Sequence, residues 1–192
     1  MQRRCRYTLA GISPICVAAC LCVSPLARAQ VSETITATAS VKTSHSTSAT
    51  APLTVRIDKF STDKERDQVM AALQKGGTDA VRTLLLTRPP LGTVIFGNTN
   101  TSVEYAYEHA THEGRILIAI TSSPIAYMGE HAPGAPVKSG AYVGVVILEV
   151  KTAGAGHGEL VPATKIHLDK QGSIVTDDYS DDVVHLSNVV GK

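Results

Sequence analysis

Alternation of apolar and polar residues predicts that most of this chain forms β-strands. Apolar residues, with Glu33 at one of their positions, alternate with threonine and serine over residues 31–41. The same two-residue period returns at 53–58 and 102–108. Residues 115–121 and 142–150 are apolar at nearly every position, which is typical of central strands covered on both faces. Further strands are predicted at residues 160–168, 173–176 and 183–190.

Two consecutive helices are predicted near the start of the domain. Thr62 and Glu65 have the spacing of a capping box, and the pair Gly76–Gly77 predicts the end of that helix. A second helix is predicted from Thr78 to the residue before Pro89, because proline disfavours helical geometry in the preceding residue. Tight turns between the strands favour antiparallel pairing. We therefore expect an α+β fold, a twisted antiparallel sheet with two consecutive helices packed on one face or end.

Residues 1–29 have the three parts of a secretory signal peptide. An arginine-rich start precedes an uncharged, mostly apolar run, and Ala27-Arg28-Ala29 fits the cleavage pattern before Gln30. Two alternatives stay open. One is a retained membrane anchor, and the other is lipidation at Cys20, because the preceding Val-Ala-Ala resembles a lipobox. We expect export, to the periplasm or as a secreted protein, with one α+β domain at residues 30–192.

Composition limits the function once the signal segment is set aside. All four cysteines and four of the arginines lie within residues 1–29. Removing 29 of the 192 residues leaves 163 residues without cysteine and lowers the formal net charge from +1 to −3. This composition excludes a disulfide scaffold, a thiolate zinc site, a cysteine nucleophile and a strongly basic nucleic-acid binder. We expect no nucleic-acid partner, and membrane contact only through the signal sequence unless it is retained or lipidated.

Several blocks of the sequence resemble an uncharacterised family of exported bacterial proteins. In chain order they are TVRIDKFSTDKERDQVMAAL (Thr54–Leu73), GRILIAITSSPIAYMGE (Gly114–Glu130), ELVPATKIHLD (Glu159–Asp169) and LSNV (Leu186–Val189), spread over about residues 53–190. The resemblance implies a signal peptide followed by one domain. It implies no known activity, cofactor or catalytic residue, and the family pattern lacks the histidines and aspartates considered next.

His109 and His112 are candidate zinc ligands. Two imidazoles flanked by glutamates near a turn could hold the metal, with a third ligand from His131, His157 or His167. Their spacing differs from the HExxH motif, in which both histidines lie on one helix face. His109 continues a predicted strand while His112 lies in a turn, so a solvated hairpin is the alternative.

Four aspartates around one predicted hairpin loop are candidate calcium ligands. They are Asp177, Asp178, Asp181 and Asp182. Calcium binds oxygen ligands and would relieve the repulsion among these carboxylates. The order of an EF-hand loop is missing, so a solvated acidic turn is the alternative. Apart from this possible calcium site we expect no cofactor.

The sequence favours a binding protein over a conventional enzyme. The glycine-rich residues 153–158 lead into a strand, whereas phosphate-binding loops lead into a helix. No GxSxG motif is present. Our hypothesis is an exported, non-enzymatic binding or interaction domain with a protein or small-molecule partner. The alternatives are an enzyme in which Glu104, Glu108 and His109 assemble in space, and a calcium-stabilised extracellular module.

Overall fold

The chain forms a mainly β structure. A computed structural model describes residues 32–42, 48–125, 142–170, 173–177 and 183–192, which contain one helix and eleven strands. In chain order the elements are β1 (Glu33–Lys42), β2 (Ser48–Ile57), α1 (Asp63–Leu86), β3 (Gly92–Phe96), β4 (Thr99–Val103), β5 (Tyr105–Ala110), β6 (Gly114–Thr121), β7 (Val143–Lys151), β8 (Gly156–Thr164), β9 (Ile166–Leu168), β10 (Ile174–Thr176) and β11 (Val184–Gly191).

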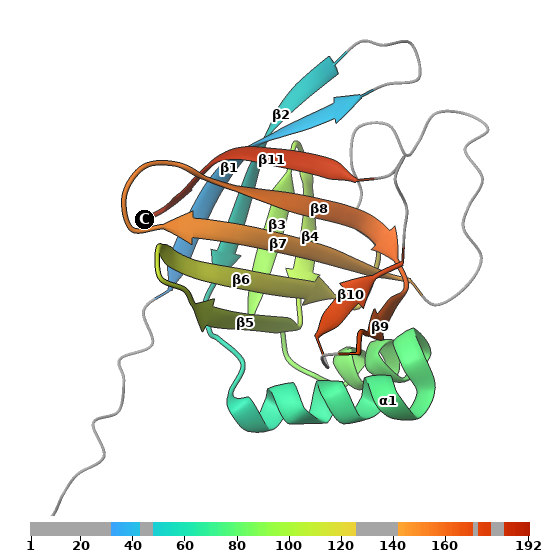
Figure 1. Cartoon of the computed structure of the whole chain (residues 1–192). Coiled ribbons are helices and arrows are strands. Elements are labelled where there is room, and N and C mark those ends of the chain that lie inside the picture. The colour runs from blue at the N-terminus through green and yellow to red at the C-terminus, as the bar shows by residue number, and fades with distance from the viewer. Residues whose placement is uncertain (1–31, 43–47, 126–141, 171–172, 178–182) are drawn as a thin grey trace, which may run out of the picture.

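Nine of these strands form one sheet that closes almost into a barrel. Their order is β4-β3-β2-β1-β11-β8-β7-β6-β5, and each neighbouring pair is antiparallel. The first and last strands, β1 and β11, pair in the middle of the sheet, whereas its two edges, β4 and β5, follow each other in the chain. Figure 1 shows β6, β7 and β8 crossing in front of β3 and β4, so the sheet folds over itself into two layers.

The expected α+β fold with two consecutive helices is wrong. Gly76 and Gly77 have non-helical backbone angles, but the helix continues past them as one kinked element, α1. Thr78, expected to cap a second helix, uses its hydroxyl on β9 instead. This hydroxyl accepts a bond from the Ile166 N–H at 2.8 Å and donates one to the Ile166 carbonyl at 3.1 Å. The glycine pair therefore bends the helix, and the other described elements are strands.

Helix α1 begins at the predicted capping box and covers the outside of the barrel. Thr62 accepts from the Glu65 N–H, and the Glu65 carboxylate accepts from the Thr62 N–H at 2.7 Å. The apolar side of the helix packs on the outer faces of β5, β6 and β7 and against β9, below the barrel in Figure 1. The buried members of this outer cluster are Val69, Leu73, Val81, Leu85, Tyr105, Ile120, Val143, Val145 and Ile166.

The two edges of the sheet meet at a corner made by Glu104. The alternation over residues 102–108 predicts one strand, but the strand breaks at this glutamate. Its N–H donates to the Ile120 carbonyl at 3.2 Å, and its carboxylate accepts from the Ser122 N–H at 2.7 Å. Both bonds tie the corner to the end of β6. The chain therefore passes from one edge of the sheet to the other at a single residue, as in orthogonally packed sheets.

Apolar side chains fill the interior of the barrel. Inward-facing apolar positions alternate along most strands of the nine-stranded sheet, as the two-residue period predicts. The buried members are Ile35, Ala37, Ala39, Leu53, Val55, Ile57, Val94, Phe96, Val103, Ala106, Leu117, Ala119, Ile125, Val146, Leu148, Val150, Leu160, Val184, Leu186 and Val189. The interior is thus the hydrophobic core of the fold, so concave surface for a ligand is left at the outer faces and ends of the barrel.

Candidate functional site

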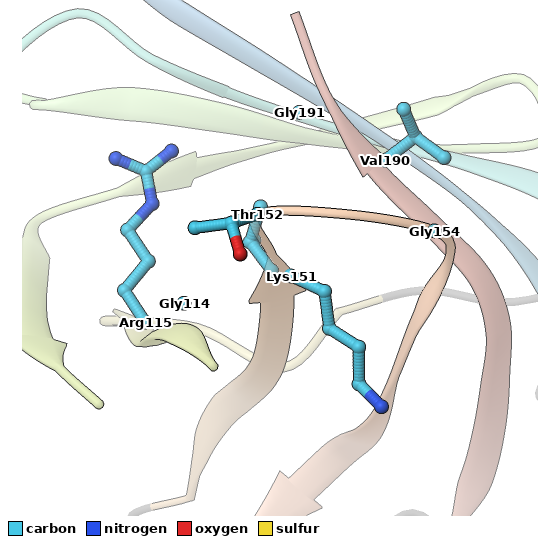
Figure 2. Close-up of a pocket in the computed structure, with 8 residues that line it drawn as sticks. Gly114, Arg115, Lys151, Thr152, Gly154, Val190 and Gly191 are labelled. Carbon is cyan, nitrogen blue, oxygen red and sulfur yellow. The ribbon is translucent and has the colours of Figure 1, made fainter. Parts of the chain in front are cut away.

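One end of the barrel, the mouth, carries an open hollow. It lies where β6 begins, where β7 and β11 end, and beside the turn between β7 and β8. Its volume is about 480 Å³, which is within the usual range for small-molecule sites. The lining residues, shown in Figure 2, are Gly114, Arg115, Val150, Lys151, Thr152, Gly154, Val190 and Gly191.

Arg115 bridges three strands across the mouth. Its Nη1 lies 3.0 Å from a carboxylate oxygen of Glu108 on β5, and its Nη2 pairs with a carboxylate oxygen of Glu33 on β1. The Glu33 side chain is 13% exposed, compared with 41% for Glu108 and 32% for Arg115. Strand β1 is not a neighbour of β6 in the sheet, so this ion pair connects the two layers directly.

The two-residue period of the strands places these three charges together. Glu33 precedes the inward-facing Ile35 by two residues, and Arg115 precedes the inward-facing Leu117 in the same way. Glu108 similarly follows the inward-facing Ala106. Each charged residue therefore continues an inward-facing row beyond the apolar core, where the barrel opens to solvent.

The environment of Glu33 favours its neutral form. Burial raises the pKa of its carboxyl group, and the nearby charge of Glu108 raises the pKa further, while Arg115 lowers it by charge attraction and hydrogen bonding. Burial is the largest of these effects, and the pKa of Glu33 is above its ordinary value. Loss of solvation therefore outweighs the attraction of the guanidinium.

Lys151 and Thr152 form a second group at the hollow. The Lys151 Nζ lies 3.7 Å from Glu113 and 3.9 Å from Glu149, and the Thr152 hydroxyl donates to the Glu113 carbonyl at 3.1 Å. In Figure 2 the side chains of Lys151 and Arg115 extend in opposite directions. The two cations therefore do not form a clamp around one anion.

Carboxylates outnumber cations around the mouth. The four ion pairs described above join two cations to four glutamates, none of which lines the hollow. The wall of the hollow thus presents hydrogen-bond donors and apolar groups, while the wider surroundings are acidic. The donors suit a ligand with hydrogen-bond acceptors, and the surrounding carboxylates disfavour a ligand that carries more than one negative charge.

The predicted zinc ligands lie near the mouth in different elements. His109 belongs to β5, and His112 lies in the turn between β5 and β6; both are exposed. Of their possible third ligands, His157 lies 3.1 Å from Glu149, and His131 is outside the described residues. Within the part of the chain that the structure describes, no three histidine, cysteine or acidic side chains are arranged to hold a metal ion.

One of the four predicted calcium ligands can be placed. The Asp177 Oδ1 lies 2.9 Å from Nδ1 of His167, and the Asp177 N–H donates to the Lys165 carbonyl at 2.9 Å. These contacts join the β9–β10 hairpin. Asp178, Asp181 and Asp182 are outside the described residues, so the structure does not test the calcium site.

The three residues predicted to assemble an acid–base site are not brought together. Glu104 lies before β5 with its carboxylate on the Ser122 N–H, whereas Glu108 lies toward the other end of the strand and pairs with Arg115. His109 follows Glu108 directly and therefore faces the opposite side of the strand. The sequence reasoning instead missed Arg115 and its link to β1. The signal that could have indicated Arg115 is its position in the sequence, where a charged residue continues the row of inward-facing apolar residues of its strand.

No protein-family model, no curated protein and no solved structure matches the chain. The resemblance to a family of exported proteins stays a prediction. Among the described residues, no helix has both the length and the apolar character needed to span a membrane. The predicted signal peptide at 1–29 lies outside the described residues.

Proposed function

We propose that this protein is an exported, non-enzymatic binding domain that recognises its partner at the hollow of the barrel mouth. The proposal depends mainly on the contrast between a barrel interior filled by apolar side chains and an open hollow with polar walls at its end. Small barrels of this kind use their interior as core, so the mouth offers the concave surface that a ligand needs. Export, to the periplasm or outside the cell, is inferred from the signal-peptide pattern of residues 1–29.

The hollow offers donors beside apolar surface. An arginine side chain has five N–H donors, and Arg115 uses two of its terminal nitrogens on Glu33 and Glu108, which leaves N–H groups for a ligand. The exposed Thr152 hydroxyl is a second polar contact, and Val190, 42% exposed, provides apolar area. A small molecule or short peptide segment with acceptors and a short apolar group would match this surface.

Glu33 and Glu104, two carboxyl groups with raised pKa values, have structural partners, which supports binding over acid–base catalysis. Glu33 pairs with Arg115, and Glu104 accepts from the Ser122 N–H. Burial raises the pKa of Glu104 and raises that of Tyr105 to about 12, the latter in the cluster beneath α1. Burial within the fold accounts for these pKa shifts, whereas a catalytic acid or base also needs contact with a substrate.

A ligand screen by nuclear magnetic resonance tests this function. The chain from Gln30 contains the whole described fold, and its labelled amides can be followed during titration with small molecules, short peptides and metal ions. We expect shift changes at residues 114–115, 150–154 and 190–191. Binding should weaken in Lys151→Gln and stay unchanged in Lys165→Gln, which removes an exposed lysine from outside the lining.

Three outcomes would contradict the proposal. Shift changes confined to another surface would place recognition elsewhere, and turnover of a screened compound would support the enzyme alternative. A higher unfolding temperature with calcium than with chelator would support the calcium-stabilised module.

A further inference from the structure

We propose that Glu33 is a built-in competitor for Arg115: while ionised it occupies the guanidinium, and once neutral it leaves Arg115 able to bind the carboxylate or sulfonate of a small ligand in the hollow. This inference rests on the proposed function, because it takes the hollow as the binding site. It adds the chemical class of the ligand and a dependence of ligand binding on pH.

The ion pair lies directly against the wall of the hollow. A Cβ atom added at Gly191, a lining residue, would come within 2.9 Å of the Glu33 Oε1 and 3.7 Å of the Arg115 Nη2. A ligand anion reaching Arg115 past Gly191 would therefore meet the ionised carboxylate of Glu33 at the same nitrogen. Occupation of this nitrogen and repulsion between the two anions therefore weaken ligand binding while Glu33 is charged.

Arg115 can hold two carboxylates at once, because it does so with Glu33 and Glu108. Replacing Glu33 by a ligand anion would therefore preserve the local arrangement, with Glu108 still in place. Lys151 extends away from Arg115 in Figure 2, so one guanidinium receives one anionic group. Val190, another lining residue, favours a short aliphatic chain on the ligand, which defines the ligand as a small monoanion with an apolar tail.

Glu33 can become neutral without unfolding the barrel. Of the elements packed around it, β6 and β5 contribute the charges of Arg115 and Glu108, while β2 and β11 contribute the uncharged Ile57 and Gly191. Burial raises the pKa of Glu33, so it takes up a proton at less acidic pH than an ordinary glutamate.

The direction of the pKa shift fixes how stability changes with acidity. A carboxyl group with a raised pKa in the folded state contributes stability that is fully present below its unfolded pKa and is lost as pH rises through the folded one. Protonation of Glu33 is therefore compatible with the folded state. Acid releases Arg115 from β1 while the pair with Glu108 still anchors it to β5.

The first test uses the full mature chain with butyrate at about pH 7, where an ordinary glutamate is ionised. We expect Glu33→Gln to bind butyrate about tenfold more tightly than the unmodified protein, with amide shifts at the hollow. Glu159→Gln is the matched control, since it neutralises an exposed glutamate of β8. Adding Arg115→Lys to Glu33→Gln should abolish the tighter butyrate binding, because lysine lacks the planar guanidinium.

The second test uses butanesulfonate, which stays ionised in acid, and the unmodified protein. Its affinity should rise as the solution is acidified from about pH 7 through the range in which a glutamate takes up a proton, and the rise should be absent in Glu33→Gln. The pH dependence of butanesulfonate affinity is measured on the unmodified protein, so the inference stays testable if a variant fails to fold. Equal affinity in all variants, or no pH effect, would overturn the inference.

Neutral and cationic probes separate this inference from the proposed function. If butyramide or butylamine binds at the hollow while both anions do not, the hollow is a binding site but the competitor role of Glu33 is wrong. If none of the probes used in the screen and in these titrations shifts amides of the hollow, the proposed function fails as well.

Discussion

Replacing Glu104 by alanine should destabilise the domain by removing the acceptor that fixes the corner between β4 and β5. The Glu104 carboxylate accepts the Ser122 N–H at 2.7 Å, and both residues are buried. A buried donor without its partner costs about 1–3 kcal/mol, so Glu104→Ala should lower the free energy of unfolding by that amount. Glu104→Gln keeps an acceptor oxygen at the same position and should stay within about 1 kcal/mol of the unmodified protein.

Urea denaturation of the three proteins measures this difference, provided that unfolding is two-state. Burial raises the pKa of Glu104, so its stabilising contribution is fully present below the unfolded pKa and is lost as pH rises through the folded value. The free energy of unfolding of the unmodified protein should therefore rise relative to that of Glu104→Gln as the solution is acidified from the folded pKa to the unfolded one. Equal losses in the alanine and glutamine variants, or no loss in either, would refute the role assigned to the hydrogen bond.

Two further predictions concern backbone packing and the core. An added Cβ at Gly156 would lie 1.8 Å from the Glu149 carbonyl oxygen, so Gly156→Ala should cost about 3 kcal/mol. Gly154→Ala meets nothing within 4 Å, and its φ of +80° should cost about 1 kcal/mol; thermal unfolding that ranks the pair in reverse would contradict this reasoning. Leu148→Ala, at a fully buried position, should cost about 2–5 kcal/mol, whereas Leu86→Ala, at a position 58% exposed, should change stability by about 0.5 kcal/mol or less. Similar urea midpoints for the two leucine variants would count against the barrel interior as the core.

The alternation of residues predicted most of the described strands and how their faces are used, but it missed β3. The doubly apolar run at residues 115–121 is β6, whose inward side faces the core and whose outer side lies partly under α1. The spacing of Thr62 and Glu65 predicted the helix start, because a capping box is a local interaction. Local patterns of this kind carry enough information to place elements along the chain.

The errors concern interactions between distant parts of the chain. Gly76–Gly77 predicts a stop, and both residues leave helical geometry, but the helix resumes directly after them. There the hydroxyl of Thr78 bonds to Ile166, 88 residues away. The alternation across Glu104 predicts one strand, yet its hydrogen bonds to the end of β6 turn the chain at a corner. Such contacts depend on the order of strands in the sheet, which local periodicity does not specify.

The same limit applies to the mouth. Glu33 and Arg115 are 82 residues apart and come from strands that are not neighbours in the sheet. Their inward-facing positions follow from the two-residue period, but their pairing requires the sheet to close. Local patterns in the sequence therefore do not indicate that these two charges meet, and neither residue was predicted to belong to a site.

The pairing of β1 with β11 also determines when this barrel can be completed. The Ser40 hydroxyl donates to the His185 carbonyl, and these residues are 145 positions apart in the chain. Two central strands of the sheet thus come from the first and last strands of the chain. Contacts over such long sequence separation slow folding, because closing the intervening loop costs entropy before the contacts form. A chain still lacking β11 would present unpaired edges at β1 and β8. If the chain is exported, as proposed, this connectivity would keep it unclosed until its last strand is available, a state compatible with passage through a membrane as an extended polypeptide.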